Sequence, residues 1–128
     1  MQNFYWFAVC VAANGFLLLL LTVNVSRLRI KHRISYGDGG NKQLMTAIRV
    51  HGNGTEQVPV FALVILALSF LDATSWLISS LVISFTLSRL VHAIGMLGRR
   101  PELRRAGAAI TYLSQAVAVL ALMVSLFI

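Results

Sequence analysis

Four apolar segments, each close to the length of a membrane span, leave this chain few possible folds. They run from about residue 4 to 25, from about 44 or 55 to 70, from about 75 to 97 and from about 106 to 128. Roughly 20 apolar residues in a helix cross about 30 Å of hydrocarbon. Because the bilayer core offers no water to backbone groups, segments of this length form helices there. The sequence therefore predicts an all-α membrane protein, a four-transmembrane-helix bundle with residues 1–128 as a single domain.

The composition agrees with this class, because 58% of the residues are hydrophobic and 12% are charged. An ordinary soluble domain has about twice that share of charged residues. No Lys or Arg precedes the first apolar segment, which is also too long for the apolar core of a signal peptide, so we expect a permanent helix there. The single cysteine, Cys10, lies inside this helix and excludes an intrachain disulfide.

The formal net charge of +7 is concentrated in the two regions that join the first helix to the second and the third to the fourth. The cations there are Arg27, Arg29, Lys31, Arg33, Lys42, Arg99, Arg100, Arg104 and Arg105. Under the positive-inside rule, both basic loops are cytoplasmic and both termini are outside. This distribution favours contact with anionic membrane lipid over a nucleic-acid partner.

Polar side chains recur near the cytoplasmic ends of the last three predicted helices. Arg49, Asn53 and Glu56 stand at i, i+4 and i+7 and so share one helical face. Arg89 and His92, at i and i+3, do the same in the third helix. The fourth helix contributes polar side chains at the same depth, namely Arg104, Arg105 and Tyr112.

An ionisable residue at the centre of a membrane span costs about 2.5–3.5 kcal/mol and therefore faces the bundle interior, a partner or a ligand. We expect these groups to form an open site for a charged ligand. The alternative is a structural ion pair between Glu56 and Arg49 or Arg89.

The sequence allows two starting points for the second helix. It begins near residue 44, or Thr55 caps a shorter helix with Glu56 in its first turn.

Three other kinds of chemistry find no support in the sequence. Residues 36–42, YGDGGNK, lack the spacing and the closing Lys-Ser/Thr of a phosphate-binding loop. His51 and His92 have no Cys or carboxylate companions at ligand spacing, so we predict no metal. The first apolar segment also lacks the acidic residue typical of small drug/proton antiporters.

Most of these polar groups lie in three stretches, RVHGNGTEQVP from residue 49, SRLVHAIGM from residue 88 and LRRAGAAITYLSQ from residue 103. These stretches resemble the membrane-associated proteins in eicosanoid and glutathione metabolism, the MAPEG family, and especially its compact bacterial members. The resemblance implies a homotrimer of four-helix protomers in a bacterial inner membrane. It also implies that glutathione, as co-substrate, binds between neighbouring protomers near the cytoplasmic face.

The resemblance further implies roles for individual residues. Positions that hold glutathione in the family match Arg27, Arg49, Asn53, Glu56, Arg89, His92 and Tyr112. Arg104, or failing that Arg105, matches the arginine thought to stabilise the glutathione thiolate. The set suits glutathione, because arginines bind its carboxylates, Glu56 takes its ammonium group and a neighbouring arginine favours the thiolate.

The sequence departs from the family at Gly52, Met96 and Ala106. Some members have a second arginine at the first position and a tyrosine at the second, and prostaglandin E synthases place a serine near the third. These differences favour glutathione transferase or peroxidase chemistry, on a lipophilic electrophile or a lipid hydroperoxide, over an eicosanoid-specific activity. The alternative function is a non-catalytic glutathione- or lipid-binding membrane scaffold.

Overall fold

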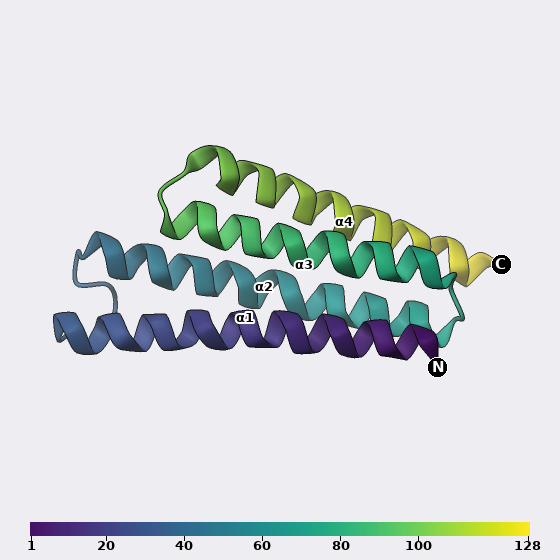
Figure 1. The fold of residues 1–128 in the computed structure, drawn as a ribbon, viewed down its shortest axis with the longest axis horizontal. Helices are drawn as coiled ribbons and strands as arrows, with labels where there is room; N and C mark the ends of the chain where they lie inside the picture. Colours follow the sequence, from purple (N-terminus) through teal and green to yellow (C-terminus); the bar gives the residue numbers. More distant parts are fainter.

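The computed structural model describes all residues from 1 to 128 and contains four helices and no strand (Figure 1). The helices are α1 (Gln2–His32), α2 (Lys42–Phe70), α3 (Ser75–Leu97) and α4 (Pro101–Phe127). Each is long and apolar enough to cross a membrane. The predicted all-α membrane fold with four spanning helices is confirmed.

The second helix is continuous from Lys42, so the shorter helix capped by Thr55 is wrong. The N-cap is Asn41, whose side-chain oxygen accepts a hydrogen bond of 2.9 Å from the Leu44 backbone nitrogen. Thr55 instead donates its hydroxyl to the carbonyl of Gly52 within the helix. Arg49 and Asn53 therefore stand on a regular helix, with the shared face that their spacing predicts.

The fourth helix begins at Pro101, earlier than the position near residue 106 that apolar character alone suggests. Proline suits the first turn, because its fixed φ matches the helix and the backbone N–H it lacks would have no partner there. The connection from α3 is only residues 98–100. As a result, Arg104 and Arg105 lie on the first turns of α4 instead of in a loop.

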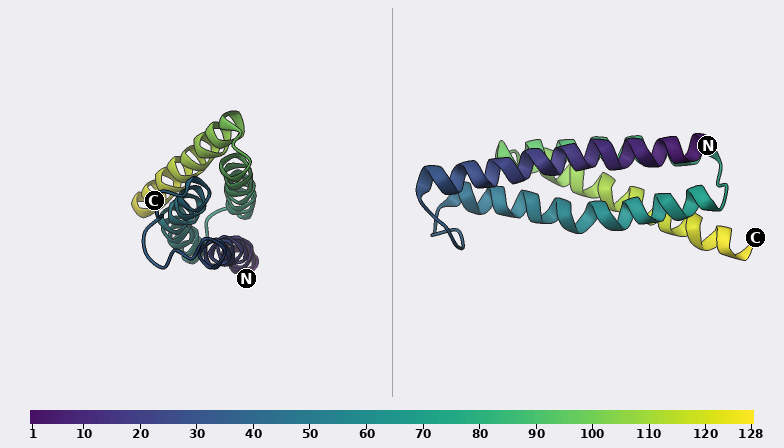
Figure 2. Two further views of the ribbon diagram at one scale, coloured as in Figure 1. Left: turned by 90° about the vertical axis from the view of Figure 1, so that its left-hand side faces the viewer. Right: turned by 90° about the horizontal axis from the view of Figure 1, so that it is seen from below.

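The helices form two antiparallel pairs, α1 with α2 and α3 with α4, that pack side by side (Figures 1 and 2). Contacts between the pairs involve α1 with α3, α2 with α3 and α2 with α4, whereas α1 and α4 do not touch. At one end, α1 and α2 continue beyond the end of α3 and leave a step in the bundle (Figure 1).

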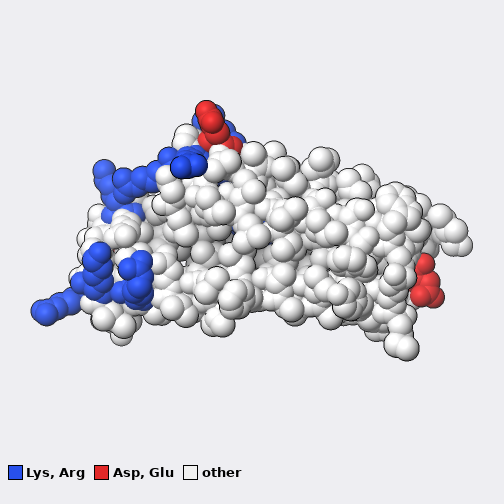
Figure 3. Space-filling view, viewed as in Figure 1, with Lys and Arg blue, Asp and Glu red and all other residues white.

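The two ends of the bundle differ in character. The basic end, which holds the α1–α2 and α3–α4 connections, carries the Lys and Arg side chains visible in Figure 3. The opposite end, called here the apolar end, holds both termini and the turn with Asp72. The largest buried cluster lies toward the apolar end and in the middle, where Phe61 and Phe85 stack with ring centroids 3.8 Å apart.

Candidate functional site

A cavity of about 290 Å³ at the basic end brings together most of the residues that the sequence singles out. It lies where α2, α3 and α4 meet, and its lining is Arg49, Asn53, His92, Met96, Arg104, Arg105, Ala108 and Tyr112. The polar groups predicted to lie at one depth on three helices thus face one space. None of the four acidic residues of the chain lines it.

Arg89 lies behind this cavity and is only 3% exposed. Its guanidinium donates a 2.6 Å hydrogen bond to the Asn53 side-chain oxygen, and it lies 3.4 Å from His92 Nδ1 and 3.5 Å from the Thr111 hydroxyl. None of these partners carries a carboxylate. A buried cation without an acidic partner is costly, and its field favours an anion in the adjoining cavity.

Within one chain Glu56 forms no ion pair with Arg49 or Arg89, and Asn53 occupies the place beside Arg89. Glu56 is exposed on the outside of α2 and does not line the cavity. Within one chain, therefore, the structure unites Arg49 and Asn53 with groups of α3 and α4 and leaves Glu56 outside. Its expected contact with an ammonium group stays a prediction.

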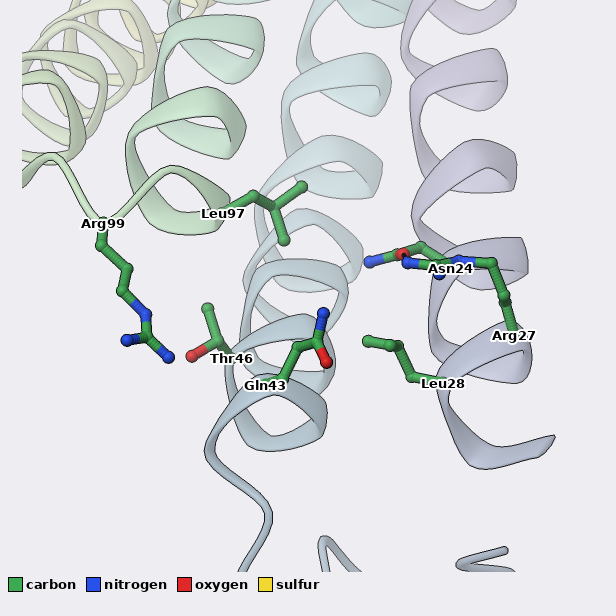
Figure 4. Close-up of a pocket in the computed structure, with 7 residues that line it drawn as sticks. All are labelled: Asn24, Arg27, Leu28, Gln43, Thr46, Leu97 and Arg99. Carbon is green, nitrogen blue, oxygen red and sulfur yellow. Dashed lines mark hydrogen bonds between the residues drawn. The ribbon is translucent and has the colours of Figure 1, made fainter. Parts of the chain in front are cut away.

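Arg27 also lies apart from this cavity. It is exposed near the end of α1 and lines a different pocket with residues of α2 and α3 (Figure 4). Arg27 Nη2 donates a 2.9 Å hydrogen bond to the side chain of Asn24, one turn earlier on α1. Its expected role beside glutathione stays a prediction.

Two buried hydroxyl groups lie beside Arg89 and were not predicted from the sequence. The Thr111 and Ser88 hydroxyls lie 2.8 Å apart between α4 and α3, and Thr111 also donates to the carbonyl of Gly107. A sequence signal for Thr111 exists: the small residues Gly107, Thr111, Ser114 and Ala118 repeat along one face of α4. Such a stripe marks close helix packing in membranes.

Two glycines fix how closely α3 approaches α4 beside the cavity. A methyl group added to Gly107 would lie 2.5 Å from the backbone nitrogen of His92. One added to Gly95 would collide with the backbone of Arg104. The missing side chains therefore let the two backbones touch, and this contact sets His92 and Arg104 at the same opening.

His51 and His92 act as hydrogen-bonding groups. His51 Nε2 lies 2.8 Å from the Thr22 hydroxyl and links α2 to α1, while His92 lies beside Arg89. The chain has no group of three or more His, Cys, Asp or Glu side chains that could hold a metal ion. The chemistry of the cavity is instead that of three guanidinium groups from Arg49, Arg104 and Arg105 facing an amide, an imidazole and a phenol.

This fold and cavity define a class: a four-helix membrane protein with a basic site, free of acids, between its helices near one membrane surface. The chain belongs to the MAPEG family, whose pattern matches residues 7–124. Two relatives are the inner membrane protein YecN of Escherichia coli strain K12 and that of E. coli O6:H1 strain CFT073. Each is 33% identical over 114 residues, which cover 89% of this chain and 87% of the relative.

Proposed function

We propose that the protein is a membrane-bound glutathione transferase. The observation that carries the proposal is the cavity between α2, α3 and α4, in which three arginines and no acid face the opening. Glutathione has two carboxylates and a thiol that reacts as its thiolate, so it needs a site rich in cations. Membership of the MAPEG family supports the same ligand.

Each side chain of the cavity has a task in this reaction. Arg49 binds a glutathione carboxylate through charge-assisted hydrogen bonds, and Asn53, held by Arg89, offers its amide N–H groups. Arg89 is a positioning residue, because it lies behind Asn53 and His92 rather than in the lining. Arg104, with Arg105 beside it, stabilises the thiolate.

The chemical step is a nucleophilic attack by sulfur. The thiol proton passes to solvent, and the thiolate electron pair forms the new S–C bond while the electrophile's leaving group departs with its own pair. With a lipid hydroperoxide, the thiolate attacks the O–O bond, and a second glutathione completes the reduction to an alcohol, water and glutathione disulfide. Both substrate types are lipophilic and reach the site from the bilayer.

The lipid side of the cavity fits such a substrate. Tyr112 is 56% exposed on α4, and Met96 and Ala108 form the apolar part of the lining. Arg49 and Arg104 form its polar part. The sulfur of a bound glutathione would thus lie between a charged wall and a surface open to hydrocarbon, where an apolar electrophile concentrates.

Three further properties belong to the proposal. The protein is a homotrimer, in which a neighbouring protomer brings Glu56 and Arg27 toward the ligand. It is an integral protein of the bacterial inner membrane, as its relatives, inner membrane proteins of Escherichia coli, suggest. The basic end faces the cytoplasm and the termini face outward, because short loops rich in Lys and Arg stay on the cytoplasmic side.

The decisive experiment titrates glutathione into the purified protein and follows thiolate absorbance in the ultraviolet. We expect a signal for the native chain and its loss in Arg104→Ala, together with a fall of about 100-fold in conjugation of 1-chloro-2,4-dinitrobenzene. Arg33→Ala removes a cation of the basic end that lies outside the cavity and serves as the matched control. Absence of binding at millimolar glutathione would end the proposal.

A second candidate function is a non-catalytic glutathione- or lipid-binding scaffold. Met96 favours it, because this side chain lines the cavity at a position where some family members have a tyrosine, and a thioether cannot donate a hydrogen bond to the thiolate. Glutathione binding without conjugation of any standard electrophile identifies the scaffold. Restored turnover in Met96→Tyr would then show that one hydroxyl separates the two functions.

A further inference from the structure

A second pocket of about 290 Å³ lies at the step where α3 ends and α1 and α2 continue. Figure 4 shows its lining residues, which are Asn24, Arg27, Leu28, Gln43, Thr46, Leu97 and Arg99. Within one chain it shares no lining residue with the cavity proposed for glutathione. We call it the headgroup pocket.

The polar groups of the headgroup pocket suit an anion. Arg99 lies on one side and Arg27 with Asn24 on the other, with Gln43 and Thr46 between them (Figure 4). Asn24 accepts a hydrogen bond from Arg27, which holds that guanidinium in place. The Gln43 side-chain oxygen lies 3.3 Å from His32 Nε2, so its amide N–H groups are left for the pocket. No acidic residue lines the pocket.

The depth of the pocket in the membrane points to phosphate. The 23 residues of α3 span about 35 Å at 1.5 Å per residue, slightly more than the roughly 30 Å of a hydrocarbon core. A pocket at the end of α3 therefore lies near the level of the lipid phosphates. Leu28 and Leu97 give it an apolar wall beside the guanidinium groups, as the junction of a headgroup with acyl chains requires.

The backbone at Arg99 makes this residue suitable for a test by substitution. Arg99 has φ of 53°, in the left-handed region, whereas the preceding Gly98 has an ordinary φ of −85°. A non-glycine residue there costs of order 1 kcal/mol, and glycine would remove that cost. Arg33, at the end of α1, has a similar φ of 55° but does not line the pocket. Arg33 is thus a matched reference for the charge and backbone of Arg99.

We propose that the headgroup pocket binds a phosphate group through Arg27 and Arg99, which clamp it from opposite sides. Arginine suits this task, because its planar guanidinium donates paired hydrogen bonds to phosphate oxygens. Basic pockets between membrane helices bind anionic headgroups by the same chemistry. The phosphate comes either from an anionic phospholipid or from a soluble phosphate. Arg27 is also proposed to approach the glutathione of a neighbouring protomer, so Arg99, which has no role in the proposed transferase, is the residue that tests this site.

The test measures thermal unfolding of the full chain in detergent with three probes: dioleoylphosphatidylglycerol, dioleoylphosphatidylcholine and inorganic phosphate. A ligand that binds only the folded state raises the unfolding temperature. We expect phosphatidylglycerol to stabilise the protein and phosphatidylcholine not to. In Arg99→Gly the affinity falls about tenfold, as expected for one lost charged hydrogen bond. Glycine fits the backbone at this position, so the variant folds.

Controls separate this site from general surface charge and from the transferase cavity. Arg33→Gly makes the same chemical change outside the pocket and should leave the phosphatidylglycerol response intact, as should Arg104→Ala. Stabilisation by inorganic phosphate with the same dependence on Arg99 assigns the site to a soluble ligand. Equal stabilisation by both lipids, equal losses in Arg99→Gly and Arg33→Gly, or no response to phosphatidylglycerol or phosphate overturns the proposal.

Discussion

The apolar end and the basic end of this bundle are built from the same four helices but use opposite kinds of contact. Toward the apolar end, the helices interlock through the stacked rings of Phe61 and Phe85 and a cluster of ten buried apolar residues. At the basic end, the buried apolar clusters shrink to three residues each, and cavities lined by arginine take their place.

This contrast separates stability from ligand binding. Lipid tails are as apolar as leucine, so close packing and not removal from water holds membrane helices together. The apolar end supplies that packing. The basic end can then keep Arg89 buried beside Asn53 without a carboxylate and leave its cavities open. The comparison predicts that changes at one end alter the free energy of unfolding, whereas changes at the other alter ligand affinity.

The largest effect on stability is expected at the apolar end. Phe61→Ala removes a ring that is 1% exposed and stacked on Phe85, and should lower the free energy of unfolding by about 3 kcal/mol, since the bundle cannot fill the cavity. Chemical unfolding in detergent measures it. Phe16→Ala, at a ring that is 62% exposed, is the control and should change little. Under conditions in which the variant stays folded, its glutathione affinity should remain within about twofold of the native value. A fall in affinity together with stability would contradict the division between the two ends.

A change at the α3–α4 contact should affect both properties. Gly107→Ala places a methyl group against the His92 backbone, so we expect a loss of about 2 kcal/mol of unfolding free energy and weaker glutathione binding as the helices separate. Gly15→Ala is the matched control. A methyl group at Gly15 meets no atom within 4 Å, and alanine is the better helix former. Equal effects of the two variants would show that this contact does not position the site.

The reverse pattern is expected for the buried arginine. Arg89→Met removes an uncompensated cation and should leave the free energy of unfolding unchanged or raised, because apolar side chains often replace buried charges without loss. Glutathione affinity, measured by titration calorimetry, should fall about tenfold as Asn53 loses its partner and the cavity its positive field. Arg89→Lys retains the charge and should recover part of the affinity. A large destabilisation with unchanged affinity would make Arg89 purely structural.

The smallest effect on the free energy of unfolding is expected midway between the two ends of the bundle. Gln115 on α4 donates a 2.6 Å hydrogen bond to the side chain of Gln57 on α2, where these helices have few other links. Gln115→Leu should reduce the unfolding free energy by about 0.6 kcal/mol, the average for such bonds in membranes. Ser125→Ala, which removes a hydroxyl bonded only within α4, is the comparison and should have less effect.

Much of the architecture follows directly from the order of residues. Apolar runs of membrane length require helices, so the four-helix fold and the position of the basic connections could be read without coordinates. The spacing of Arg49 and Asn53 likewise predicts their shared face. The ends of the helices are harder to read: α4 begins at Pro101 among charged residues, because backbone geometry and not hydropathy sets its start.

Contacts between helices were decided only in three dimensions. A one-dimensional pattern records which face of a helix is polar but not which neighbour meets it. Glu56 shares the face of Asn53 by spacing, yet lies outside the cavity, whereas Met96 and Ala108 line it. The sequence by itself determined four membrane helices with cations at one end, since length and polarity act along each helix. The close approach at Gly95 and Gly107, the burial of Arg89 and the pocket at the end of α3 depend on how the helices cross, which only the tertiary structure decides.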